Sequence, residues 1–89
     1  MSEVKAISVT GTGAVVSTRA RILGVSFTSD GVGAGTLVVT DGTGGATVLD
    51  VDCSSGADRD ITFPGGLLCK DAVTVATFTN LTSATFILG

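Results

Sequence analysis

The chain has 89 residues, 13 of them glycine, and it contains no histidine, tryptophan or tyrosine. Its formal net charge is −3, and 44% of its residues are hydrophobic whereas 15% are charged. This length predicts one domain, 1–89, and the missing histidines remove the usual base for serine or cysteine nucleophiles, so we expect a protein that is not an enzyme.

The composition gives no sign of a membrane or nucleic-acid partner. No apolar run approaches the ~20 residues of a membrane-spanning helix, and the start of the chain lacks the pattern of a secretory signal. Nucleic-acid binding requires a concentration of positive charge. The five cations are instead scattered along the sequence: Lys5, Arg19, Arg21, Arg59 and Lys70.

A chain this small has little interior. The expected folded surface is roughly 4,700 Å², so that folding buries about 62% of the surface of the unfolded chain. Such a domain is marginally stable alone, and its hydrophobic share is high for an exterior that is wholly wet. We therefore expect part of the exterior to face protein.

Alternation with a period of two recurs along the chain, whereas helical spacing never persists for more than a turn, which predicts an all-β fold. The first strand is predicted at 4–10 and ends at the glycine-rich turn 11–13. The second is predicted at 14–28 as one long bent strand, with Gly24 as a bulge or a point of close approach.

Within this second strand, simple alternation assigns the two faces. One face carries Arg21, Leu23, Val25 and Phe27, and the other carries the residues between them, including Ile22.

A glycine-rich turn at 29–35 precedes a strand at 36–40. Three consecutive aliphatic residues in that strand predict that both of its faces are covered. The Asp-Gly pair that opens 41–45 predicts a hairpin loop, and the return strand at 46–53 is expected to be wet on one face.

The segment Pro64-Gly65-Gly66 is predicted to stop a strand ladder. The remaining predicted strands are 60–63, 67–69, 72–78 and 83–88. Seven or eight short strands with frequent turns predict an antiparallel β-sandwich, or a small jelly roll or barrel.

The sequence contains two cysteines, Cys53 and Cys69. Two are too few for a disulfide scaffold, and without histidine or further cysteines they make no zinc site. Buried free thiols and a cross-strand disulfide both remain open.

Four carboxylates surround one loop and are the weak candidates for a metal site: Asp50, Asp52, Asp58 and Asp60. Clustered carboxylates can bind Ca²⁺, but the same pattern describes a solvated strand face. The segment that starts at Asp50 resembles the start of an EF-hand loop, but Ile61 stands where the bidentate glutamate belongs, so we reject that motif. The glycine-rich loops lack a phosphate-binding ending, and no cofactor is expected.

The four phenylalanines, Phe27, Phe63, Phe78 and Phe86, are predicted to be core residues. Phe86 has a second possibility, a subunit interface, because it lies on the last strand. The interface candidates belong to the first and last strands and are Val4, Ile7, Val9, Phe86, Ile87 and Leu88.

Three segments carry a resemblance to a known group of proteins: Arg21-Ile22-Leu23-Gly24-Val25, then the run from Gly35 to Gly42, then Ile61-Thr62-Phe63-Pro64-Gly65-Gly66 with a closing apolar strand. Over about 20–88 the chain resembles small Gly/Thr/Val-rich virion proteins of tailed bacteriophages, in particular capsid decoration (cement) and head-fibre proteins of marine and cyanobacterial phages.

The resemblance implies a β-sandwich or barrel that caps shell proteins, with no cofactor and no catalytic residues. The implied partners are the major capsid protein and further copies of the chain, with a trimer the first expectation. The implied location is the capsid surface of the virion, after synthesis in the host cytoplasm.

Two other functions remain open. One is a tail or head-fibre module that touches a host glycan, although the chain has no tryptophan or tyrosine for such a site. The other is a small calcium- or carbohydrate-binding adaptor that uses the acidic loop 50–60.

Overall fold

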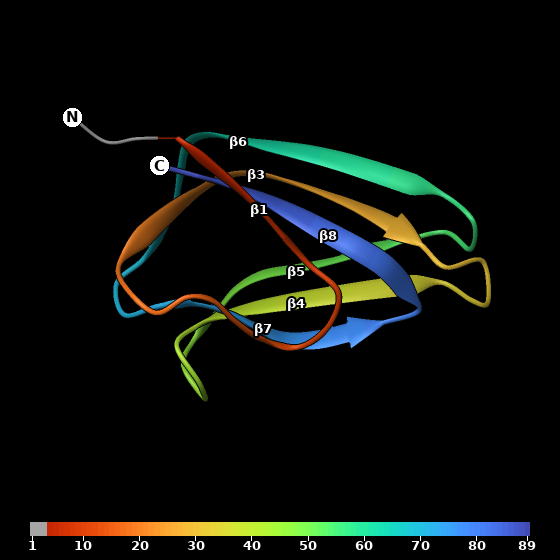
Figure 1. The fold of residues 1–89 in the computed structure, drawn as a ribbon, viewed down its shortest axis with the longest axis horizontal. Coiled ribbons are helices and arrows are strands. Elements are labelled where there is room, and N and C mark those ends of the chain that lie inside the picture. Colours follow the sequence, from red (N-terminus) through yellow and green to blue (C-terminus); the bar gives the residue numbers. More distant parts are fainter. Residues whose placement is uncertain (1–3) are drawn as a thin grey trace.

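The computed structural model describes residues 4–89, which form eight strands and no helix (Figure 1). The strands are β1 (Lys5–Val9), β2 (Gly13–Val16), β3 (Ala20–Ser29), β4 (Gly35–Asp41), β5 (Thr47–Cys53), β6 (Asp58–Cys69), β7 (Val73–Thr79) and β8 (Leu81–Leu88). The prediction of an all-β chain is confirmed.

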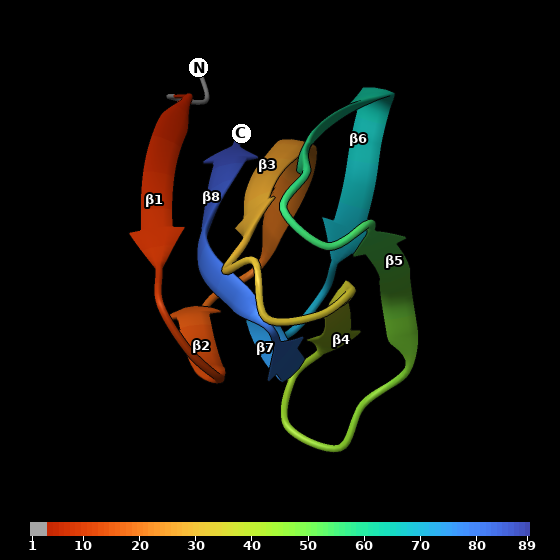
Figure 2. The same ribbon diagram turned by 90° about the vertical axis from the view of Figure 1, so that its right-hand side faces the viewer.

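The strands form two four-stranded sheets that pack face to face (Figure 2). Sheet A has the order β1-β8-β3-β6, sheet B has the order β2-β7-β4-β5, and all neighbours are antiparallel. The strands therefore pair as first with last, second with seventh, third with sixth and fourth with fifth. This is the winding of a jelly roll, and the two sheets are separate layers, so the predicted sandwich is confirmed in its jelly-roll form.

The predicted strand at 14–28 is in fact two strands, β2 and β3. The chain leaves sheet B at Val16 and enters sheet A at Ala20. The prediction of one strand was wrong because the short connection at 17–19, where the chain changes sheets, contains no glycine or proline to mark the break.

The predicted bulge at Gly24 is confirmed, and it changes the faces of β3. The register of β3 shifts between Ile22 and Gly24 against both of its neighbours, β6 and β8. As a result, Ile22 joins Val25 and Phe27 in the core, with exposed fractions of 0%, 2% and 1%. The predicted face that grouped Leu23 with Val25 and Phe27 was therefore wrong, because strict alternation fails across a bulge.

β4, one of the two middle strands of sheet B, is covered on its inner face alone. Leu37 and Val39 are fully buried, whereas Val38 between them is half-buried on the outer face. The prediction that both faces are covered was wrong, because residues 4–89 form two sheets and no third layer on sheet B. The predicted hairpin loop after β4 is confirmed: the Asp41 N–H donates to the Ala46 carbonyl oxygen at 2.9 Å, and Gly42 has a φ of 81°.

The predicted interruption near Pro64 is also present. The ladder between β3 and β6 passes from the pair Gly24–Thr62 to the pair Ile22–Leu67, so that 63–66 bulge out of register. Gly65 and Gly66 both have positive φ, 80° and 79°, which glycine adopts at little cost.

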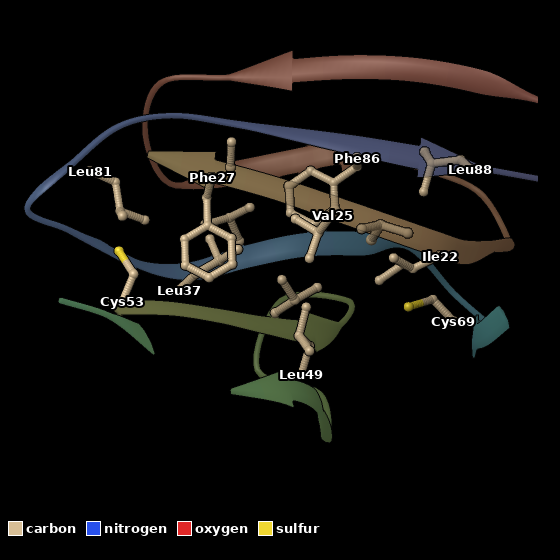
Figure 3. Close-up of a cluster of buried hydrophobic side chains, with 14 residues drawn as sticks. Ile22, Val25, Phe27, Leu37, Leu49, Cys53, Cys69, Leu81, Phe86 and Leu88 are labelled. Carbon is tan, nitrogen blue, oxygen red and sulfur yellow. The ribbon is translucent and has the colours of Figure 1, made fainter. Parts of the chain in front are cut away.

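The core lies between the sheets, and Phe27 and Phe86 are its largest fully buried side chains (Figure 3). Phe63 and Phe78 are half-buried and pack against it. The folded surface is 4761 Å², close to the expected value. Among residues 4–89, the exposed large hydrophobic residues are Val4 and Val32. The expected surplus of apolar exterior is therefore not found, because the aliphatic residues are used in the core and at its margins.

Candidate functional site

The first and last strands, which carry the predicted interface residues, lie side by side in sheet A. Ile7 is opposite Phe86 in the ladder between β1 and β8, and Val9 is opposite Ala84. Since Phe86 and Ala84 point into the core, Ile7 and Val9 point the same way, and both pack against the core at its margin. Val4, just before β1, is 67% exposed.

The end of β8 contributes less to the surface than predicted. Phe86 and Leu88 are buried, with exposed fractions of 0% and 3%, and Figure 3 shows both side chains in the cluster between the sheets. Their burial is explained by the alternation of the strand, which leaves Ile87 between them on the outer side. Phe86 is therefore a core residue in this fold, and Ile87 is the part of this segment that a partner can reach.

The outer side of sheet A is built from short, uncharged side chains. The outward residues of β1 and β8, those of β3 after its bulge and Thr62 in the middle of β6 form what we call the uncharged face: Ala6, Ser8, Ser26, Thr28, Thr62, Ser83, Thr85 and Ile87. The Ser8 and Thr85 hydroxyls share a 2.7 Å hydrogen bond across β1 and β8. Charged residues lie at the margins of this face, with Arg21 at one end and Asp58 and Asp60 along β6.

The four candidate metal ligands do not come together. Asp50 and Asp52 lie opposite Val38 and Thr36 on the outer side of sheet B. Asp58 and Asp60 lie opposite Thr28 and Ser26 on the outer side of sheet A. Within residues 4–89 there is no group of three or more acidic, histidine or cysteine residues that could hold a metal ion.

At the acidic loop, Arg59 instead contacts Asp52. Its guanidinium Nη1 donates a 2.8 Å hydrogen bond to the Asp52 carbonyl oxygen and lies 4.0 Å from the Asp52 carboxylate. Both side chains are at least half exposed, so this ion pair contributes little to stability.

The two cysteines are buried free thiols, the first of the two predicted alternatives. Cys53 is opposite Gly35 in sheet B, and Cys69 is opposite Ala20 in sheet A. Figure 3 shows the two at opposite ends of the core, which excludes a disulfide between them in this fold. Burial, with a smaller contribution from the Asp41 charge, raises the pKa of the Cys69 thiol, so Cys69 does not resemble a reactive nucleophile.

Sequence reasoning missed the function of Asp41. Its carboxylate accepts backbone N–H groups from Lys70 at 3.0 Å, Asp71 at 2.8 Å and Ala72 at 3.4 Å. These hydrogen bonds to the ionised form lower the pKa of Asp41. No local spacing reveals them, because the donors lie about thirty residues further along the chain. The carboxylate fixes the loop that contains these donors.

Sequence reasoning also missed a concentration of positive charge at one end of the sandwich. Two adjoining open hollows of about 280 and 260 Å³ share Arg19, Ala20 and Gly89 in their walls. Lys5 lines the first hollow and Arg21 the second. Three of the five cations therefore meet in space, and the prediction that the cations are scattered holds for the sequence but not for the fold.

The topology explains this meeting of charges. β1 and β3 both flank β8, and Lys5 and Ile22 are both register partners of Leu88. Lys5 is thereby brought to the end of β3 where Arg19 and Arg21 lie. We call this feature the basic hollow.

No family model, curated protein or solved structure matches this chain. Residues 4–89 also contain no helix with the length and hydropathy of a membrane-spanning segment.

Proposed function

We propose that this chain is a virion structural protein of a bacteriophage, a capsid decoration protein that attaches to the major capsid protein and stabilises the shell through surface contact. The observation that carries the proposal is the uncharged face of sheet A, which offers a broad surface of short side chains with charges only at its margins.

A partner can cover such a face at a small cost in free energy. Alanine, serine and threonine lose little rotamer freedom when a partner orders them, and a face without charges avoids the desolvation that ionised groups impose. The uncharged centre and charged margin also follow the usual anatomy of protein interfaces.

The size of the molecule fits this mode of attachment. Each sheet lies across the longest and shortest extents of the molecule, 39 and 17 Å (Figures 1 and 2), so one side of the sandwich is of the same order as the ~800 Å² that each partner buries in a standard interface. A shell presents many equivalent positions, and neighbouring contacts on a lattice convert a weak contact per copy into tight attachment.

The free edge of β1 supports self-association as part of the proposal. β1 pairs with β8 on one side only, and an unpaired strand edge is a template for another chain. We propose a homo-oligomer, with a trimer as the first expectation because shells offer threefold positions.

Jelly rolls occur among lectins and cupins as well as capsid proteins, so the fold alone does not determine the function.

The test is attachment to shells. Purified protein is measured by multi-angle light scattering and then incubated with empty shells assembled from the major capsid protein of the same phage. We expect a defined oligomer that co-sediments with the shells and raises their melting temperature. A monomer that never co-sediments would contradict the proposal.

A matched pair of variants locates the contact. Ala6→Arg places a charge on the uncharged face, whereas Ala14→Arg makes the same change at an exposed position on β2 in the other sheet. We expect Ala6→Arg to abolish co-sedimentation and Ala14→Arg to retain it. If both variants co-sediment with the shells to the same extent, sheet A is excluded as the contact surface.

A further inference from the structure

The basic hollow is lined by positive charges, although the molecule as a whole is negative. The chain carries a formal net charge of −3, yet Lys5, Arg19 and Arg21 line the two adjoining hollows, and no acidic side chain among residues 4–89 does. A third hollow, of about 310 Å³, is lined by Asp52, Asp58 and Arg59 around the acidic loop. A segregation of like charges raises the energy of the free protein, and it favours a ligand of opposite charge.

Among residues 4–89, no acidic side chain lies within ion-pair distance of the cations of the basic hollow. The ion pair found among residues 4–89 joins Arg59 to Asp52, away from the hollow. Arg21 makes one long hydrogen bond, 3.5 Å from Nη1 to the Gly65 carbonyl oxygen. Arg19 and Arg21 are both exposed, so their guanidinium groups retain donors for an incoming anion.

The hollow has a fixed apolar floor beneath these charges. Val16 and Leu88 line the first hollow and Leu68 the second. The backbones of Arg21 and Gly89 exchange two hydrogen bonds, of 3.1 and 3.0 Å, which hold the ends of β3 and β8 together. The site therefore combines aliphatic surface with cations, and it suits a ligand that carries both carboxylates and short apolar groups.

The surroundings favour a peptide over a nucleic acid. Binding of single-stranded nucleic acid uses aromatic side chains on which bases stack. No aromatic residue lines either hollow, and Phe27 and Phe86 are fully buried in the core. The net negative charge also opposes a long phosphate backbone.

We propose that the basic hollow binds an acidic peptide segment of a partner protein. Arg19 and Arg21 pair with its carboxylates, for which the planar guanidinium fork is suited. Lys5 adds a third charge from β1, and the aliphatic floor accepts the intervening apolar side chains. This site adjoins the uncharged face at Arg21 but uses different residues, and it does not depend on attachment to a capsid.

The experiment is a titration of ¹⁵N-labelled protein followed by NMR. The probe is an acetylated octapeptide of alternating glutamate and alanine, and the glutamine–alanine octapeptide is its uncharged counterpart. We expect the acidic peptide to shift the amide resonances of 16–21 and 88–89, with an affinity that falls as salt is added. The uncharged peptide is expected to give no saturable shift.

Variants distinguish binding of the peptide at this site from a general electrostatic attraction to the protein. We expect Arg19→Ala combined with Arg21→Ala to weaken binding of the acidic peptide at least tenfold, and Arg59→Ala, in the third hollow, to leave it unchanged. Arg19→Lys combined with Arg21→Lys keeps the charge and removes the guanidinium fork, so it should lose only part of the affinity. This charge-preserving variant also serves if the alanine variant fails to fold, as judged by its amide spectrum.

Three results would overturn the proposal. The first is a set of shifts that lies outside the hollow. The second is equal weakening by Arg59→Ala. The third is binding of octathymidylate or inorganic tripolyphosphate as tight as that of the acidic peptide, which would make the hollow a site for phosphate chemistry.

Discussion

The carboxylate of Asp41 accepts the backbone N–H of Asp71 at 2.8 Å, although 30 residues separate them. The same carboxylate accepts the N–H of Lys70 at 3.0 Å. Asp41 ends β4 and the two donors precede β7, which is the neighbour of β4 in sheet B. One side chain thereby anchors the crossing from sheet A to sheet B that follows β6.

We predict that Asp41→Asn lowers the thermal midpoint at neutral pH, because a neutral amide replaces a charge-assisted acceptor. The pKa of Asp41 is lowered from its ordinary value of 3.8, chiefly by the Asp71 and Lys70 N–H groups. A lowered folded-state pKa stabilises the fold above pH 3.8 and loses that contribution as the pH falls further.

Thermal melts between pH 7 and pH 2 test this sign. The gap in midpoint between wild type and Asp41→Asn should close below pH 3.8. Asp50→Asn is the control, because Asp50 is exposed on the outer side of sheet B, and it should show little change. A gap that persists unchanged in acid would contradict the carboxylate mechanism.

Gly24 gives a prediction about the bulge. A Cβ at this position would lie 3.0 Å from the Ile61 carbonyl oxygen, which is backbone and has little freedom to move. Gly24→Ala should therefore cost about 1–3 kcal/mol of unfolding free energy, as overpacking does. Gly11→Ala is the matched control, since nothing lies within 4 Å of its added Cβ. Urea unfolding measures the stability of both variants. Equal stabilities would show that β3 and β6 can move apart at Gly24 without a loss of unfolding free energy.

Gly24 also shows how far the sequence predicts this fold. Glycine within a run of alternating residues correctly predicted a bulge, and the Asp-Gly pair correctly predicted the loop after β4. The bulge then reversed the faces before it, so that Ile22 and not Leu23 entered the core. Local patterns predict where a strand is irregular, but the inward face depends on the neighbours that the strand meets.

Which candidate residues lie together in space depends more on the strand topology than on local sequence patterns. Lys5 and Arg19 are 14 positions apart in the chain, and the order β1-β8-β3 brings them to one end of the sandwich. By contrast, Asp52 and Asp58 are close in sequence, yet they lie in β5 and β6, which belong to different sheets. Proximity in sequence made the four aspartates weak candidates for a metal site. The strand order places two on each sheet, and although Asp52 and Asp58 line one hollow, residues 4–89 contain no group of three or more side chains that could hold a metal ion.

Phe86 provides a prediction that distinguishes a core residue from an interface residue. Its side chain is fully buried in this fold, so Phe86→Ala should cost about 3–5 kcal/mol. Ile87→Ala, one residue later on the outer side, should cost much less. Urea unfolding at several protein concentrations tests this. A Phe86→Ala protein that keeps its stability but loses its oligomeric state would contradict the assignment to the core.

Phe86→Leu keeps the measurement possible if the alanine variant does not fold. The smaller loss of volume should leave a folded protein with reduced stability. Its loss of stability should remain the same at every protein concentration, because the missing contacts lie within one copy of the chain.

Ser29 joins the loops at the end of the sandwich opposite to the basic hollow. Its buried Oγ accepts the N–H of Gly56 at 2.9 Å and that of Gly31 at 3.1 Å, and it donates to the Gly33 carbonyl oxygen at 3.1 Å. Ser29→Ala leaves these backbone groups without a partner and should cost about 1–3 kcal/mol. Ser26→Ala is the control, because Ser26 is exposed on the same strand.

Amide hydrogen exchange separates this mechanism from a general loss of stability. Because Ser29 is the acceptor for the Gly31 and Gly56 amides, these two should exchange faster in Ser29→Ala, beyond the acceleration of the core amides. The amide of Val25, in the middle of β3, should follow the global change alone. Uniform acceleration at all three positions would mean that Ser29 acts through packing, and the loops at 31 and 56 would then be held by other contacts.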